Sequence, residues 1–193
     1  MDFRILHYAT LDSTNHLALE FARQGAQEGT VVLAEYQTKG RGRFKRRWVS
    51  PRGSGLLFSI ILRPTIKTSS TSLLTHIAAQ AVAEALTKSF GLPAKLKRPN
   101  DVLIAGKKIA GILSESSSYG QRLEYVIIGI GVNVNTQRKR LLKTATSIYL
   151  ETKTKVSKDK VLGDILAAFR LKYTSLLKKD LSEKEKTIPN MVC

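Results

Sequence analysis

A short basic segment rich in glycine, residues 40–48, has the clearest capacity for chemistry in this sequence and reads G-R-G-R-F-K-R-R-W. Glycines let a backbone come close to a ligand, and arginine guanidinium groups donate paired hydrogen bonds to phosphates or carboxylates. The segment is not a P-loop, because it does not match the pattern G-x-x-x-x-G-K-[ST]. It is not a dinucleotide-binding fingerprint either, because the third glycine of G-x-G-x-x-G is missing. By itself it fits an anion-binding loop, a solvated charged loop or an RNA-binding segment.

A second polar segment, residues 96–101, reads L-K-R-P-N-D and precedes a further pair of lysines. Pro99 favours a turn, and the Asn-Asp pair after it can cap that turn or bind polar groups. Lys108 stands beside the apolar residues 109–113, a position from which its ammonium could project from a sheet into a cleft. A lysine on a strand edge is usually solvated, and a tight connection before a hairpin explains the segment equally well.

A third segment, residues 129–135, reads G-I-G-V-N-V-N and ends an apolar run. Glycines at such a place allow a flat ligand to lie on the backbone, and Asn133 could hydrogen-bond a base or a ribose. The other interpretation is a bulge that ends the strand.

The elements that must position these segments follow from the hydrophobic pattern. Four residues of helix-capping type at 12–15 precede apolar residues at helical spacing, and Gly25 would end that helix. Apolar stripes predict two further helices at 72–90 and 158–179. Strands are expected at 3–8, 30–36, 56–62, 102–104, 109–113 and 123–133. Neighbouring strands with hairpin-like links predict an α+β fold: a mixed, largely antiparallel sheet flanked by helices, which we expect on one side.

Length and composition limit the class of protein. The chain has 193 residues, which corresponds to one domain with at most a small extension. Apolar residues make up 42% and charged residues 24%, as in ordinary globular proteins, and no apolar run is long enough to span a membrane. The single cysteine, Cys193, excludes an intrachain disulfide framework and a cysteine-rich metal site. These features favour a cytoplasmic protein without membrane contact.

The net charge of +17 favours polyanionic partners such as nucleotides, nucleic acid, an anionic membrane or an acidic protein. No acidic residue lies between Glu35 and Glu84, whereas seven lysines and arginines lie within residues 39–52. A second basic region, 138–186, is diluted with acids and fits a solvated helix surface.

Five segments in order resemble the catalytic domain of biotin protein ligases, over about residues 5–180. The chain has D-S-T-N at 12–15, Q-T-K-G-R-G-R at 37–43 followed by Arg46, Trp48, Ser50 and Pro51, K-R-P-N-D at 97–101, K-I-A-G-I-L-S-E at 108–115 and G-I-G-V-N at 129–133. The resemblance implies the α+β fold shared with class II aminoacyl-tRNA synthetases. It also implies ATP-dependent attachment of biotin to a lysine of the biotin carboxyl carrier protein of acetyl-CoA carboxylase, through biotinyl-5′-AMP.

The same resemblance implies a role for each matching residue. The biotin-binding residues would be Ser13, Thr14, Asn15, Gln37, Arg41, Gly42, Arg43, Lys108 and Gly111. The nucleotide-binding residues would be Arg43, Arg46, Trp48, Asn100, Asp101, Lys108 and Asn133. The catalytic residues would be Lys108, Arg43 and Arg41, which would offset the repulsion between two anions, with Mg²⁺ on the pyrophosphate. No residue is proposed as a metal ligand. Asp101 is a candidate for positioning the acceptor lysine, and a structural role for it fits as well.

The chain departs from the family pattern at two positions, because Arg98 replaces a tryptophan and Lys45 replaces a common glycine. Residues 1–180 would form the catalytic domain and 181–193 a polar tail. We expect neither an N-terminal helix-turn-helix nor a complete C-terminal β-barrel, hence no specific DNA binding, while a homodimer stays open. The rival functions are a lipoate–protein ligase or octanoyltransferase, the latter needing a cysteine nucleophile, and a nucleic-acid-binding module.

Overall fold

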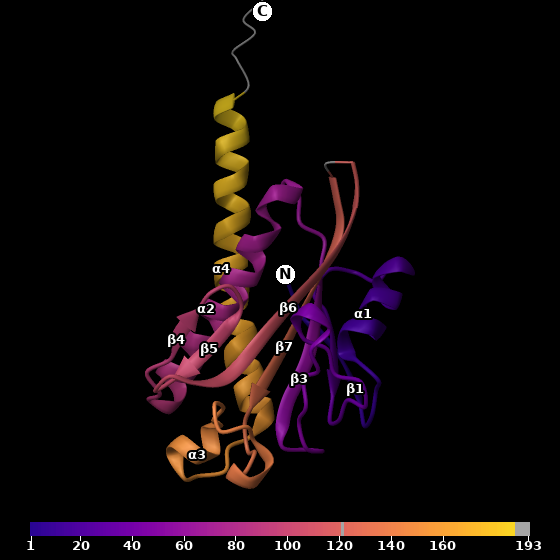
Figure 1. Cartoon of the computed structure of the whole chain (residues 1–193). Coiled ribbons are helices and arrows are strands. Elements are labelled where there is room, and N and C mark those ends of the chain that lie inside the picture. Colours follow the sequence, from indigo (N-terminus) through magenta and orange to yellow (C-terminus); the bar gives the residue numbers. More distant parts are fainter. Residues whose placement is uncertain (121, 188–193) are drawn as a thin grey trace, which may run out of the picture.

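The computed structural model describes residues 1–120 and 122–187, with the side chains of 180–187 left aside, and shows a seven-stranded mixed sheet with helices on both faces (Figure 1). The elements in chain order are β1 Arg4–Tyr8, α1 Thr14–Arg23, β2 Thr30–Ala34, the 3₁₀ turn η1 Arg43–Lys45, β3 Gly55–Leu62, η2 Thr68–Ser70, α2 Thr71–Phe90, β4 Lys95–Lys97, β5 Asp101–Ile104, β6 Lys107–Tyr119, β7 Arg122–Asn133, η3 Arg138–Arg140, α3 Ile148–Thr152 and α4 Lys158–Thr187.

The sheet has the strand order β1-β2-β3-β7-β6-β5-β4. β1 and β2 are parallel, and every other neighbouring pair is antiparallel. The longest pairings join β3, β7 and β6 at the centre, where Gly111 of β6 lies opposite Gly131 of β7. The predicted mixed, largely antiparallel sheet is therefore confirmed.

One face of the sheet packs against α2 and α4, which run side by side (Figure 1). Because side chains alternate along a strand, every second residue of β3 enters this core. The largest contributors that are almost wholly buried include Phe58, Ile60, Leu62, Leu86, Phe169 and Tyr173. Removal of this apolar surface from water is the main force that holds the helical layer to the sheet.

The opposite face is covered by α1, so the expectation of helices on one side only is wrong. Ala18 and Ala22 of α1 are buried against Val32, Ile61 and Ile127 in a second, smaller apolar cluster. The cause is the parallel pairing of β1 and β2: the chain must cross over one face of the sheet to return in the same direction, and α1 is that crossover.

Most predicted elements are confirmed, and the differences concern short or polar segments. The turn between β5 and β6 contains Ala105 and Gly106, both with positive φ, as the predicted hairpin requires. β4 and α3 were not predicted, because each is too short to show a period. β6 continues to Tyr119 through a polar run, and α4 continues to Thr187 instead of ending at 179. The last six residues, with Cys193, lie outside the described part of the chain.

Among the residues that the structure describes, no helix combines the length and the apolar character needed to cross a membrane.

Candidate functional site

The basic loop, residues 39–48, folds as a small hairpin over the face of the sheet that α1 covers. The backbone N–H of Trp48 donates to the carbonyl of Gly40 at 3.0 Å, and that of Gly42 donates to the carbonyl of Arg46 at 2.8 Å. At its tip Lys45 has φ 59°, a left-handed conformation that favours glycine. The glycine that Lys45 replaces in the family pattern would adopt this conformation without steric cost.

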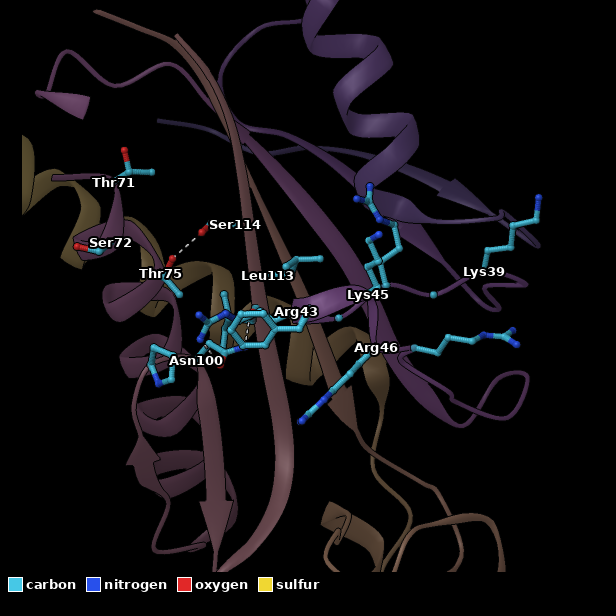
Figure 2. A pocket seen from close by; sticks show the side chains of 17 residues that line it. Lys39, Arg43, Lys45, Arg46, Thr71, Ser72, Thr75, Asn100, Leu113 and Ser114 are labelled. Carbon is cyan, nitrogen blue, oxygen red and sulfur yellow. Dashed lines mark hydrogen bonds between the residues drawn. The ribbon is translucent and has the colours of Figure 1, made fainter. Parts of the chain in front are cut away.

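A cavity of about 880 Å³ lies between this loop and the rest of the molecule. Residues 39–47 line one side, the first turns of α2 line the other, and residues 99–100 and 112–114 complete it. Figure 2 shows the lining residue Arg43 close to Asn100, and Thr75 of α2 bonded to Ser114 of β6. The volume suits a ligand the size of a small organic acid with a nucleotide. Of the residues proposed from the sequence, Arg41, Gly42, Arg43, Arg46 and Asn100 line this cavity.

The residues at the start of α1 form a buried polar group beneath the loop. The Oε1 atom of Gln37 accepts hydrogen bonds from the backbone N–H of Thr14 at 2.7 Å and from the Thr14 hydroxyl at 3.1 Å. Ser13, Thr14 and Asn15 are each less than 5% exposed. The polar residues at the start of α1 therefore have two roles: they begin the helix, and they form buried hydrogen bonds next to the sheet.

Asp12 precedes this group, and its carboxyl interacts with His16 one turn further along α1. Its carboxyl lies 3.1 Å from Nδ1 of His16 and accepts the backbone N–H of Ser13 at 2.6 Å. The hydrogen bond with His16, opposed by partial burial, holds the pKa of the Asp12 carboxyl below its ordinary value.

The sheet beneath the loop has glycines where a side chain would collide with its neighbours. A Cβ atom on Gly131 would lie 2.6 Å from the indole of Trp48, and one on Gly129 would lie 1.9 Å from Oδ1 of Asn15. A Cβ on Gly111 would approach both Trp48 and Lys108 at about 3 Å. The glycines thus let an indole and an amide lie directly on the strands.

The three glycines, Gly111, Gly129 and Gly131, form a surface that we call the glycine floor. Lys108 of β6 lies beside it, and its ammonium forms an ion pair with Asp101. Its Nζ atom lies 2.6 Å from a carboxylate oxygen of Asp101 and 5.4 Å from the centre of the Trp48 ring. The ion pair and the cation–π contact hold the ammonium beside the glycine floor. The structure therefore brings together Lys108, Asp101, Trp48 and Gly111, which the sequence places in three separate segments.

Two further predicted residues, Asn100 and Asn133, use their side-chain amides to bind backbone carbonyls of other segments. Asn100 donates from its side-chain amide to the carbonyl of Ile112 at 2.7 Å, which leaves its Oδ1 facing Arg43 at 3.5 Å. Asn133 is buried, and its amide donates to the carbonyl of Thr146 at 2.9 Å. It supports the segment that pairs with the backbone of Lys108 and does not line the cavity.

Two residues of the site were missed from the sequence. Ser59 of β3 is fully buried and hydrogen-bonds Thr14 and Asn15, and Glu115 of β6 binds Asn15 and Arg41. A signal for Ser59 was present, because it is the one polar residue in the apolar run L-L-F-S-I-I-L. Glu115 belongs to the segment 108–115 but received no role.

Known proteins resemble this chain in sequence and in fold. The model of the biotin/lipoate A/B protein ligase family matches residues 7–133. The bifunctional ligase/repressor BirA of Bacillus subtilis is 41% identical over 177 residues, covering 90% of this chain and 54% of that protein. The biotin–[acetyl-CoA-carboxylase] ligase of Paracoccus denitrificans is 44% identical over 127 residues, covering 65% of this chain and 52% of that protein.

Solved structures give the same result for the fold. The biotin protein ligase from Aquifex aeolicus in complex with biotin and ATP superposes with a TM-score of 0.78 at 31% identity, over 93% of this chain and 74% of that one. The chain spans about half the length of the curated relatives that it matches. From the family model, these relatives and the shared fold, the chain belongs to the biotin/lipoate A/B protein ligase family.

Proposed function

We propose that this domain activates biotin with ATP to biotinyl-5′-AMP, with release of pyrophosphate. It then transfers the biotinyl group to a lysine amine of a biotin carboxyl carrier protein, with release of AMP. The observation that carries the proposal is the set of arginines from the basic loop that line the cavity. Lys108 beside Gly111, and the buried polar group of Thr14 and Gln37 at the start of α1, support it. The relatives named as biotin ligases, and the one solved with biotin and ATP, support it.

The cations account for the first step. A carboxylate must approach the α-phosphate, so two anions meet and negative charge accumulates on phosphate oxygens. Arg41, Arg43 and Arg46, which line the cavity, and Lys108 of β6 would offset that repulsion. The ion pair between Lys108 and Asp101 supports a role for Asp101 in placing that ammonium, which is the structural alternative for this residue.

Mg²⁺ fits the proposal as an ion carried by the nucleotide. Among the described residues no group of three or more histidine, cysteine or acidic side chains could hold a metal ion. Mg²⁺ commonly binds substrate phosphates and water with few protein ligands, so such a group is not needed. Bound there, it would neutralise part of the charge on the pyrophosphate.

The test is incubation of the purified protein with ATP, Mg²⁺ and biotin, followed by mass analysis for biotinyl-AMP and measurement of pyrophosphate. Lipoate and octanoate are run in parallel, because the family also includes lipoate ligases. We expect about one adenylate per active site with biotin. Absence of any adenylate, or a preference for lipoate, would overturn the proposal.

We further propose a cytosolic protein that attracts DNA only weakly and without sequence preference. The net charge of +17 supports attraction to polyanions through counterion release, which weakens steeply with salt. The same charge would speed encounter with an acidic carrier domain. A titration with two unrelated DNA duplexes at low and near-physiological salt tests this, with similar binding to both duplexes expected.

A further inference from the structure

The end of the sheet next to Lys108 carries cations that the first step of the reaction does not use. Within residues 95–108 the chain has five lysines and arginines and a single acidic residue, Asp101. Lys95 and Lys97 lie on β4, the edge strand of the sheet, and Arg98 follows it directly (Figure 1). All three are exposed, whereas the carboxylate of Asp101 is already paired with Lys108. This edge therefore presents a net positive charge to solvent.

Strand register places two of these cations on the same face of the sheet as the glycine floor. Lys97 lies opposite Asp101, and Asp101 lies opposite Gly111. Opposite residues of an antiparallel pair share a face, and side chains alternate along a strand, so Lys95 shares that face with Lys97. Leu96 between them points the other way, into the core beneath α2 and α4. A row of side chains thus leads from the glycine floor to the edge of the sheet.

This end of the face is more open than the end beneath α1. α1 packs on β2, β3 and β7, whereas Leu103 of β5, on the same face as Lys97, is only partly buried. Lysines on an edge strand can also serve merely to prevent pairing with another strand. Charges on either face of β4 would meet that need, yet both lysines lie on the face that leads to Lys108. The arrangement therefore fits a surface that continues the site.

We propose that Lys95, Lys97 and Arg98 form a docking surface for the acidic face of the protein domain that carries the acceptor lysine. This inference rests on the proposed function. In the transfer step the acceptor amine attacks the carbonyl carbon of biotinyl-5′-AMP. A C–N bond then replaces the bond from that carbon to the phosphate oxygen, AMP leaves, and the amine loses a proton to solvent.

The acceptor differs from biotin and ATP because it belongs to a folded domain. Such a domain needs a surface next to Lys108 on which it can rest while its lysine enters the site. Exposed cations at the rim of an interface attract a partner of negative potential and raise the rate of association more than the final affinity. The docking surface would therefore act on the transfer step and leave adenylate formation unchanged.

The test separates the two half-reactions, with the unbiotinylated carrier domain of a biotin carboxyl carrier protein as the acceptor. Lys95→Glu/Lys97→Glu reverses two charges of the docking surface. Lys67→Glu/Lys178→Glu makes the same change in net charge at two exposed lysines elsewhere and is the control. At low ionic strength we expect kcat/KM for the carrier domain to fall about tenfold in the first variant and to stay within about twofold in the control. The rate of adenylate formation should stay within about twofold in both.

Salt and a small acceptor show whether surface charge is the cause. At about 0.5 M salt the first variant should come within about twofold of the parent, because exposed charges are then screened. Nα-acetyl-lysine amide has no protein surface to dock, so it should accept the biotinyl group at the parent's rate in both variants. Lys95→Glu alone should give an intermediate loss with the carrier domain, since half of the change in charge remains.

Two results of these assays would overturn the inference. One is an equal loss of adenylate formation and of transfer, which would mean that the substitutions damage the site itself. The other is transfer to the carrier domain within twofold of the parent at low salt. If that unchanged transfer came with weaker binding of a DNA duplex, the surface would belong to nucleic acid instead. Failure of the parent to form biotinyl-AMP would refute the proposed function and not the docking surface.

Discussion

The two faces of the sheet use the same strands for different purposes. On β3, Phe58 and Ile60 enter the core beneath α2 and α4, whereas Ser59 between them turns to the site. On β7, Ile128 and Ile130 face the same core, whereas Gly129 and Gly131 lie beneath Asn15 and Trp48. Because side chains alternate along a strand, neighbouring residues of β3 and β7 serve the apolar core on one face and the site on the other.

The difference shows where the molecule can tolerate polar and small residues. The face beneath α2 and α4, called the helical face below, is packed with leucine, isoleucine, valine, alanine and aromatic side chains that are nearly all buried. The opposite face, called the site face below, keeps an apolar cluster beneath α1. Near the basic loop it has glycines, a buried serine and a carboxylate instead, each with a partner from a loop or from α1. Substitutions on the first face should therefore change stability, and those at the site residues of the second face should change activity, with a change in stability as well where a buried contact is disturbed. The predictions below test that separation.

The largest effect is expected from Phe58→Ala on the helical face. Phe58 is fully buried, and removal of its ring leaves a cavity between β3 and the helices. We expect the free energy of unfolding to fall by about 3–5 kcal/mol, measured by urea denaturation. Val49→Ala, at a residue that is 72% exposed, is the control and should change it by less than about 0.5 kcal/mol. A loss below about 1 kcal/mol for Phe58→Ala would contradict the assignment of this face.

Lys108→Ala on the site face should slow the reaction and leave the free energy of unfolding nearly unchanged. Loss of one charged contact of about 3 kcal/mol to the reacting groups corresponds to roughly a hundredfold slower adenylation. The free energy of unfolding should change little, because the ammonium is partly exposed. The neighbouring Lys107→Ala, at an exposed residue, should stay within twofold in rate. A rate for Lys108→Ala within threefold of the parent would remove Lys108 from the mechanism.

Replacement of glycine by alanine should lower the free energy of unfolding at Gly129 and raise it at Gly163. Gly129→Ala places a Cβ 1.9 Å from the Asn15 amide, so we expect a loss of about 1–3 kcal/mol in the free energy of unfolding and weaker biotin binding. Gly163→Ala on α4 meets nothing within 4 Å and should stabilise the helix by about 0.5–1 kcal/mol. Thermal unfolding measures the stability of the two variants, and titration measures their affinity for biotin. Equal changes in melting temperature for the two variants would argue against the close approach of Asn15 to Gly129.

The smallest effect concerns the polar edge of the helical layer. Glu84 of α2 lies 2.7 Å from Lys172 of α4 and 2.6 Å from Lys88, and these hydrogen bonds, that of Lys172 first, lower its pKa from 4.5 to about 2. A depressed carboxyl pKa stabilises the folded state above pH 4.5, and the contribution disappears as the pH falls toward 2. Glu84→Gln should cost less than about 1 kcal/mol at pH 7, and the difference from the parent should shrink between pH 4.5 and 3 in urea denaturation. A difference that does not depend on pH would exclude the ion pairs as its cause.

The sequence predicted the α+β class, the central strands and the long helices, because each has a clear period or a long apolar run. It did not predict which face α1 covers, since that depends on the parallel pairing of β1 and β2. β4 was missed because three residues, Lys-Leu-Lys, are too short for a pattern.

The site was predicted as separate motifs, and its internal contacts were not. The resemblance gave Lys108, Trp48 and the loop arginines, whereas the ion pair of Lys108 with Asp101 and the contact of Trp48 with Gly131 depend on strand register. Ser59 and Glu115 were missed because their significance lies in which side chains they meet across the sheet, and local sequence does not contain that information.

The position of Trp48 also allows ligand binding at the site to be followed by tryptophan fluorescence. The chain contains a single tryptophan, and its indole lies on the glycine floor, with its Nε1 atom buried and without a hydrogen-bond partner in the described part of the chain. Fluorescence excited selectively in the indole therefore originates at the site alone, with no background from a second indole. A ligand that displaces the ring, or gives its N–H an acceptor, will change the wavelength and intensity of that emission, so binding can be followed in the unmodified protein without a label.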